Sequence, residues 1–273
     1  MSTGEQAERQ PTAAYIAKHP VFEIGHMAAE LALRGGVRAA HERAKHHMQQ
    51  GRLVRVARGI YASVPAGIDP SSFVPDKFLV ARAAREDAVF CYHSALELHG
   101  VAQSHWSDCT VFTAKRRSSI SLGAGAVHFL SIPSAIGKGH GSFGEALVQR
   151  SGQSLRIAGP ERTLVEGFRR PDRAGGVEEH IDSCSALGVL GVDLLFKVLA
   201  RYGERRLWSA VGWFLERHQE QFFVTDDHLR KAESRASNSP IYLDRKERGG
   251  KLMSRWSLIV PDMLTSGMEG DRG

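Results

Sequence analysis

Hydrophobic and polar positions in the first quarter of the chain predict three short helices followed by a hairpin. The first helix ends before Pro20, because the residue preceding a proline avoids the helical conformation. The second ends at Gly35-Gly36, since glycine ends a helix at little cost. The predicted helices cover Thr12 to Lys18, His26 to Leu33 and Val37 to Gln50, with a brief extended piece at Val21-Phe22.

The third predicted helix has a narrow apolar stripe and a donor-rich flank. The stripe consists of Val37, Ala40, Ala44 and Met48, which recur at spacings of three and four and are expected to face inward. The outward flank carries Arg38, His41, Glu42, Lys45 and Gln49. Such a flank is typical of any solvent-facing helix, but its side chains also suit phosphates and base edges.

The stretch GRLVRVARGIYAS places Arg52, Arg55 and Arg58 on a β-prone ribbon. Leu53 to Val56 and Gly59 to Ala62 read as strands, and Arg58-Gly59 supplies a glycine at the reversal. The order of these elements is that of a winged helix-turn-helix: two helices, a glycine break, a polar-faced helix and an arginine-bearing hairpin. In that motif one helix enters the major groove and the hairpin lies beside the backbone.

The remainder of the chain predicts a larger mixed α+β domain with a helical C-terminal half. Three prolines between Pro65 and Pro75 indicate a linker. The expected organisation is a winged helix-turn-helix domain over 12–64, a linker over 65–76 and an α+β domain over 77–265. Its expected helices are Lys77 to Arg85, His93 to His99, Glu161 to Phe168, Val177 to Leu187, Val192 to Tyr202, Leu207 to Gln219 and Asp226 to Ala236. Its expected strands are Thr110 to Thr113, Val127 to Ile132, Leu155 to Ala158, Ile241 to Leu243 and Trp256 to Val260.

The charge of the chain is concentrated in one segment. Between Arg34 and Arg58 there are seven basic residues and one acidic residue, a net +6 that equals the net charge of all 273 residues. Clustered Lys and Arg favour a polyanion partner, because they release counterions from phosphates. A solvated basic surface without a partner is the alternative reading of the charge alone.

Composition favours a reducing cytoplasm. The three cysteines have no paired spacing, and the chain shows neither a signal peptide nor an apolar run long enough for a membrane span. The ends, MSTGEQAERQP and TSGMEGDRG, lack apolar periodicity and are expected to be loose.

Motifs for catalysis, cofactors or metals are weak. GKGHGSFG lacks the ending of a phosphate-binding loop, and His46, His47, His93, His99, His128 and His140 have no metal-ligand spacing. Ser94 lies near His93, Glu97 and His99 but outside the context of a nucleophile elbow. Asp244, Glu247 and Lys251 loosely resemble a nuclease cluster. We therefore expect no cofactor, no metal and no enzyme activity.

Three segments together resemble the AbiEi-type antitoxins of type IV toxin–antitoxin, or abortive-infection, systems. They are QQGRLVRVARGIYAS, CYHSALELHG and RIAGPERTLVEGFRRPDRAGGVEE, and the late stretch YLDRKERGGKLMSRWSLIV is similar too. The winged-helix segment alone is weakly specific, and the conjunction of the motifs carries the resemblance. The glycine-rich GKGHGSFG loop departs from it.

The resemblance implies a transcriptional autorepressor that binds inverted repeats in double-stranded DNA. It also implies an antitoxin that counteracts a nucleotidyltransferase-like toxin without forming a stable complex with it. Inverted repeats require two copies, so we expect a homodimer on DNA. The expected DNA-binding residues are Arg38, His41, Lys45, Gln49, Arg52, Arg55 and Arg58. One alternative is a DNA-directed nuclease or nucleotide-modifying enzyme with its chemistry in the second domain, and another is a regulator whose second domain binds a small-molecule effector.

Overall fold

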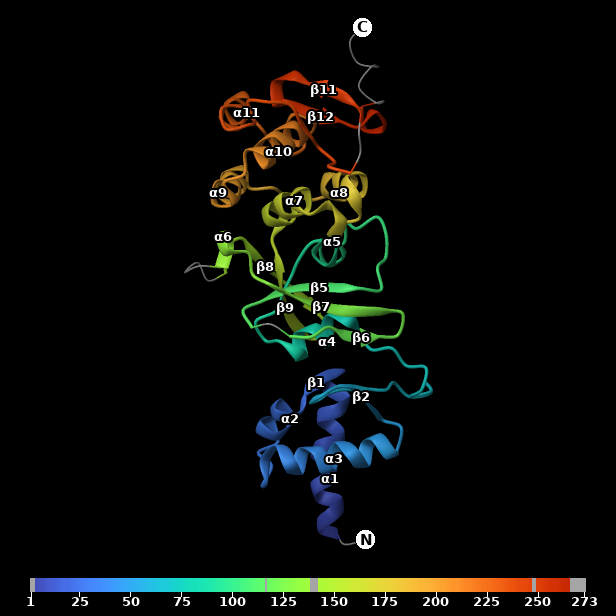
Figure 1. Cartoon of the computed structure of the whole chain (residues 1–273). Helices are drawn as coiled ribbons and strands as arrows, with labels where there is room; N and C mark the ends of the chain where they lie inside the picture. Colours follow the sequence, from blue (N-terminus) through green and yellow to red (C-terminus); the bar gives the residue numbers. More distant parts are fainter. Residues whose placement is uncertain (1–2, 116, 138–141, 247–248, 266–273) are drawn as a thin grey trace. The chain divides into compact units, whose positions relative to one another are not determined.

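The computed structural model describes residues 3–115, 117–137, 142–246 and 249–265, drawn in Figure 1. Most of the C-terminal stretch expected to be loose lies outside the described residues. The chain divides into two compact units. Unit 1 comprises Met1–Ala88, Trp106–Ser131 and Gln149–Leu155, and unit 2 comprises Val89–His105, Ile132–Val148 and Arg156–Gly273. The fold is mixed α+β, as the sequence predicts.

The N-terminal part of unit 1 has the predicted succession of elements. In chain order they are α1 (Thr3–Lys18), β1 (Val21–Glu23), α2 (Ile24–Glu30), α3 (Gly36–Gln49), β2 (Leu53–Ala57) and β3 (Ile60–Ser63). The expected start of the first helix at Thr12 was wrong, because α1 begins at Thr3 and includes Pro11. The early stretch GEQAERQ lacks an apolar stripe, but it is rich in residues of high intrinsic helix propensity.

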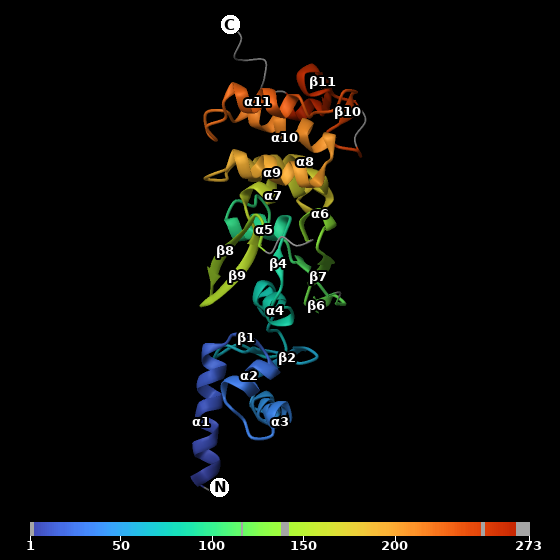
Figure 2. The same cartoon turned by 90° about the vertical axis from the view of Figure 1, so that its left-hand side faces the viewer.

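The three strands of this part form an antiparallel sheet in the order β1-β3-β2. One face of the sheet carries Phe22 and Tyr61, which pack with Tyr15, Met27 and Ala44 in a core shared with the helices. The other face packs against α4 (Lys77–Ala84), as Figure 2 shows. Both faces of the sheet are therefore covered, and the sheet supports α3 and holds the β2–β3 hairpin in place.

Unit 1 also contains a second group of strands. Residues 64–76 hold turns and no helix or strand, and α4 follows with Asp76 as its N-cap. The strands are β5 (Cys109–Thr113), β6 (Ile120–Leu122) and β7 (Gly125–Ser131), with β7 between a parallel β5 and an antiparallel β6. The sequence did not predict β6, because three residues within KRRSSISLGAGA give no readable alternation. The domain limits given above stay a prediction.

Unit 2 begins with short elements around β4 (Val89–Phe90) and α5 (His93–His99). β4 pairs in parallel with β9 (Gln153–Ala158), next to β8 (Glu145–Arg150). The tip of the β8–β9 hairpin, Gln149–Leu155, is grouped with unit 1. The sequence did not predict β8, whose residues are half-buried or exposed and so lack an apolar face. The short helix α6 spans Ser134–Gly137.

The rest of unit 2 is the predicted helical half. Its helices are α7 (Pro160–Arg169), α8 (Gly176–Ser185), α9 (Val192–Tyr202), α10 (Arg205–Arg217) and α11 (Asp226–Glu233), with short 3-10 turns η1 (Pro171–Arg173), η2 (Ser254–Trp256) and η3 (Asp262–Leu264). α7 packs against α8, α9 and α10 (Figure 2). A three-stranded sheet, β10 (Ile241–Tyr242), β12 (Leu258–Val260) and β11 (Lys251–Met253), closes the unit.

Two further findings bear on the composition. All three cysteines are buried as free thiols. Within the described residues, no helix combines the length and the apolar character needed to cross a membrane.

Candidate nucleic-acid interface

The four predicted contact residues of α3 lie on one exposed face. Arg38, His41, Lys45 and Gln49 are all exposed. At about 100° per residue, their positions fall within an arc of roughly 80°. The buried residues of the helix, Ala40, Ala44 and His47, lie on the opposite side. The helix therefore presents a row of hydrogen-bond donors to solvent, with the exposed carboxylate of Glu42 at its edge.

The predicted inward stripe of α3 was partly wrong. Ala40 and Ala44 are buried, but Val37 and Met48 are 47% and 38% exposed, and His47 takes the third buried position. Counted from Ala40, Val37 and Met48 are rotated by roughly 60–80°, whereas Ala44 and His47 lie within roughly 40°. The spacing of three and four therefore placed Val37 and Met48 at the edge of the buried face.

His41 joins α3 to the sheet. A hydrogen bond of 3.1 Å connects its Nδ1 to the hydroxyl of Tyr61 on β3, and Tyr61 itself is buried. One ring nitrogen of His41 is thus engaged within the protein, which leaves Nε2 for an external contact. The bond holds the exposed face of α3 in a fixed orientation relative to the ribbon of β2 and β3.

Arg55 belongs to the same side of the ribbon as this bond. It is paired directly with Tyr61 across β2 and β3, and directly opposed residues of an antiparallel pair point to the same face. A register irregularity follows between Arg55 and Ala57, and the guanidinium of Arg55 donates to the Ala57 carbonyl at 3.4 Å. The structure therefore brings Arg55 together with the exposed face of α3.

Arg58 and Arg52 lie at the two ends of β2. Arg58 is exposed at the two-residue turn, where Gly59 adopts a φ of 78° that favours glycine. Arg52 is exposed too, but it lines a cavity of about 740 Å³ together with His47 and Ile68. The structure thus places Arg52 toward α1 and not beside Arg55, so the seven predicted residues do not form one continuous surface.

The cations of this surface are not held in ion pairs within the described structure, although Glu42 is exposed on the same side of α3. Throughout the described part of the chain, no ion pair involves Arg38, Lys45, Arg55 or Arg58. Arg43, in contrast, donates to the hydroxyl of Thr12 at 3.1 Å and ties α3 to α1. Exposed cations without carboxylate partners retain their charge for an external anion.

Sequence reasoning missed two residues at this surface. Val37 and Met48 are exposed apolar side chains that border the row of donors on α3. Their position follows from the same rotation per residue that defines the row, so a full helical projection of the sequence would have placed them there. Apolar side chains beside base-reading donors are suited to the methyl group of thymine.

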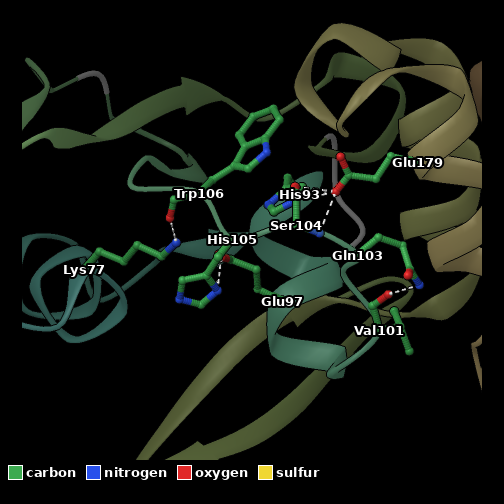
Figure 3. A network of polar contacts seen from close by, with 9 residues as sticks. All are labelled: Lys77, His93, Glu97, Val101, Gln103, Ser104, His105, Trp106 and Glu179. Atoms are coloured by element: carbon green, nitrogen blue, oxygen red, sulfur yellow. Dashed lines mark hydrogen bonds and ion pairs between the residues drawn. The ribbon is translucent and has the colours of Figure 1, made fainter.

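A polar cluster in unit 2 has the residue types of a hydrolytic triad but a different geometry. The carboxylate of Glu179 accepts from the Ser104 hydroxyl at 2.6 Å and lies 3.0 Å from His93 Nε2, which in turn is 3.2 Å from the same hydroxyl (Figure 3). In a triad the histidine uses separate nitrogens for the nucleophile and the carboxylate. Here one nitrogen contacts both, and the cluster fastens the segment at Ser104 to α8.

The remaining contacts of Figure 3 are also structural. His105 lies 3.4 Å from Glu97, and Lys77 donates to the Trp106 carbonyl. Ser94, which the sequence placed among polar neighbours, is 2% exposed. His99 Nε2 contacts the carbonyl of Ala158 at 2.9 Å, so it packs at the end of α5.

The motif PERTLVEGFRR forms a buried charged network in α7. Arg162 is 1% exposed and donates to Glu166 at 2.8 Å, and the Tyr202 hydroxyl donates to the same carboxylate oxygen at 2.9 Å. Burial raises the pKa of Glu166, while the charge of Arg162 opposes that shift. Removing one partner of such a pair leaves an uncompensated buried charge. The motif therefore maintains the fold of unit 2.

The candidate metal and nuclease residues do not assemble in the described structure. No group of three or more His, Cys, Asp or Glu suited to a metal occurs among the described residues. Asp244 accepts the backbone N–H of Lys246 at 2.8 Å, and Lys251 lies on β11. Glu247, His140 and the residues 138–141 of the glycine-rich loop lie outside the described residues.

Comparison with known proteins gives a fold. No protein-family model and no curated protein matches the chain. The structure is similar to the crystal structure of the RV2827C protein from Mycobacterium tuberculosis, with a TM-score of 0.61 and 16% sequence identity over 93% of this chain and 91% of that chain. At that identity the likeness shows a shared fold over nearly the full length of both chains.

Proposed function

We propose that this protein is a DNA-binding transcriptional autorepressor and antitoxin, with a winged helix-turn-helix over residues 12–64. The observation that carries the DNA-binding part is the shared surface of Arg38, Lys45 and Gln49 on α3 with Arg55 on the ribbon, held together by the bond between His41 and Tyr61. These are donor side chains without carboxylate partners in the described structure, and duplex DNA is the polyanion that such a ribbon-and-helix surface fits.

The helix is the proposed reader of base edges. Arg and Lys suit the O6 and N7 acceptors of guanine, and Gln suits adenine. Lys45 and Gln49 are four residues apart and lie on the same face, so they reach neighbouring base pairs. Val37 and Met48 at the border of the row provide apolar contact for thymine methyl groups. His41, with one ring nitrogen engaged by Tyr61, acts mainly in positioning.

The ribbon is the proposed phosphate anchor. Arg55 and Arg58 project from a hairpin whose strands are held in a three-stranded sheet, so the backbone that carries them loses little freedom on binding. Phosphate contacts fix the register of a protein on DNA without carrying sequence information. Arg52, which lies toward α1, contributes to the general positive field and is not assigned a specific contact.

The antitoxin part rests on the resemblance to AbiEi-type proteins. It implies that the larger α+β domain counteracts a nucleotidyltransferase-like toxin without a stable complex. The PERTLVEGFRR motif is buried in unit 2, and a buried network is not available to a partner. The neutralising surface is therefore sought on exposed residues of the unit. A nucleotidyltransferase gene beside the gene of this protein is the genomic observation that supports this part.

Salt-dependent binding of the duplex upstream of the protein's own gene tests the DNA-binding part. If about six phosphates are neutralised per bound copy, the logarithm of affinity falls with the logarithm of salt at a slope near −5. Arg55→Ala is expected to weaken binding to every sequence and to reduce the slope by about 1. Arg230→Ala is the matched control, because it removes the same charge from α11.

Two results would count against the proposal. One is binding that does not depend on salt. The other is an Arg55→Ala protein that binds the duplex as tightly as the parent while Arg230→Ala does not. Two bound copies per inverted repeat, measured by analytical ultracentrifugation of the complex, are expected from the symmetry of the site.

A further inference from the structure

Unit 2 contains a small cavity whose lining is dominated by cations. Its volume is about 220 Å³, and its basic lining residues are Arg169, Arg170, Arg206, Arg245 and Lys246. Arg169 and Arg170 come from the end of α7, Arg206 from the first turn of α10, and the other two from the turn after β10. Three segments distant in sequence thus direct positive charge to one hollow.

Among the described residues, the ion pairs around the cavity involve only the arginines of its α7 side. Arg169 donates to Glu204 at 2.6 Å, and Arg170 donates to both carboxylate oxygens of Asp172 at 3.0 and 2.8 Å. Asp244 lines the cavity, but its carboxylate accepts the backbone N–H of Lys246 and so shapes the turn. Within the described residues, Arg206, Arg245 and Lys246 form no ion pair.

Arg206 is the least favourably placed of these cations. Among the described residues, its Nε is buried without a hydrogen-bond partner, and its Nη2 donates to the Leu243 carbonyl at 3.3 Å. Burial lowers the pKa of Arg206 and the charge of Arg245 lowers it further, while the carboxylates of Glu204 and Asp244 oppose this shift without cancelling it. A buried donor without an acceptor and a neighbouring like charge both cost free energy, and a bound anion relieves both.

We propose that this cavity binds the phosphate chain of a small phosphorylated ligand. Guanidinium groups match phosphate oxygens with paired hydrogen bonds, and among the described residues no carboxylate forms an ion pair with Arg206, Arg245 or Lys246. A volume of about 220 Å³ accommodates a short chain of phosphates and leaves the rest of the ligand outside. A DNA backbone fits less well, because a duplex presents its phosphates on a convex surface and Arg206 is recessed.

Titration calorimetry of the full-length protein with sodium tripolyphosphate at fixed ionic strength tests the proposal. The parent protein is expected to bind the probe saturably at one site. Arg206→Gln and Arg245→Gln are each expected to weaken binding by about tenfold or more, since each removes a charge-assisted contact. Arg205→Gln is the matched control, because Arg205 precedes Arg206 on α10, is exposed and does not line the cavity.

The outcomes are distinct. Saturable binding that is lost in Arg206→Gln and retained in Arg205→Gln supports the proposal, as does a melting temperature of unliganded Arg206→Gln at or above that of the parent. If Arg206→Gln fails to fold, Arg245→Gln alone tests the proposal, because Arg245 is exposed and its replacement is expected to leave the fold intact. Three results would overturn the proposal: no saturable binding, an equal loss in Arg205→Gln, or displacement of the probe by duplex DNA with weakened DNA binding in Arg245→Gln.

Discussion

At the scale of single residues, Gly167 shows how the PERTLVEGFRR motif stabilises unit 2. A Cβ at this position would lie 2.0 Å from Cε1 of His180, a buried ring that packs against Phe168. Gly167→Ala is therefore expected to lower the free energy of unfolding by about 3 kcal/mol, since the ring has no space to retreat. Urea unfolding of the full chain measures this loss.

Gly188→Ala is the control for that prediction. A Cβ at Gly188 meets no atom within 4 Å, so this substitution is expected to be neutral or to stabilise by at most about 1 kcal/mol. Equal stability of the two variants would show that the close approach of Gly167 and His180 does not constrain the fold.

His180 also makes stability depend on pH. Burial lowers its pKa from 6.5 to about 4, and Nε2 contacts the carbonyl of Leu164 at 3.0 Å. Because the folded pKa lies below the unfolded value, the unfolded state binds the extra proton first as pH falls. The associated stability is present above pH 6.5 and is lost between about pH 6.5 and 4, up to about 3 kcal/mol.

The pH prediction is measured as the change in the free energy of unfolding between pH 7 and pH 4.5. His180→Gln is expected to show a smaller change than the parent because it lacks the titrating group. His26→Gln, whose parent side chain is 64% exposed and faces the exposed Glu86, is expected to behave like the parent. A His180→Gln protein with the parent's pH dependence would refute the assignment.

At the scale of elements, the contact between α3 and the ribbon sets the geometry of the proposed interface. Tyr61→Phe removes the hydroxyl that bonds His41 and leaves the buried ring in place. We expect a stability loss of about 1 kcal/mol and a duplex affinity about fivefold lower, because the helix is no longer held relative to Arg55.

Tyr202→Phe is the matched control for this change. It also removes a buried hydroxyl bond, to Glu166 in unit 2, and so is expected to reduce stability without changing duplex affinity. Fluorescence anisotropy with labelled duplex compares the three proteins. Unchanged DNA binding by Tyr61→Phe would contradict the role given to the contact.

Most elements were predictable, and the exceptions have identifiable causes. Long amphipathic segments such as α9 (Val192–Tyr202) were predicted with their observed limits, because each buries a clear apolar stripe. Strand β6 has only three residues, and β8 buries none of its residues fully. Helix α1 extends beyond the predicted segment because helix propensity acts there without an apolar stripe.

The candidate interface was predictable in its residues and not in its arrangement. Charge clustering and spacing identified the exposed face of α3, but the sequence grouped Arg52 with Arg55, which the structure separates. The bond between His41 and Tyr61 joins residues 20 positions apart, and the basic cavity of unit 2 joins three distant segments. Such associations depend on tertiary packing and leave no local pattern in the sequence.

At the scale of the whole molecule, we propose that operator binding and toxin neutralisation reside in different domains. Lys45→Ala lies on the proposed reading face and is expected to lose discrimination at specific operator positions and to derepress the operon. The proposal assigns neutralisation to the larger α+β domain, so the same variant is expected to protect growth against a co-expressed nucleotidyltransferase-like toxin. A reporter fusion and a growth assay in the same strain measure both. Joint loss in a folded variant would contradict the separation.

The central claim is that the face of α3 and the ribbon of β2 and β3 together form the DNA-contacting surface. Hydrogen exchange of the full-length protein, with and without the duplex upstream of its gene, tests it most directly. The account predicts slower exchange on binding concentrated in α3 and the β2–β3 ribbon, from Gly36 to Ser63. Tight, saturable DNA binding with unchanged exchange across this segment and protection elsewhere would contradict it.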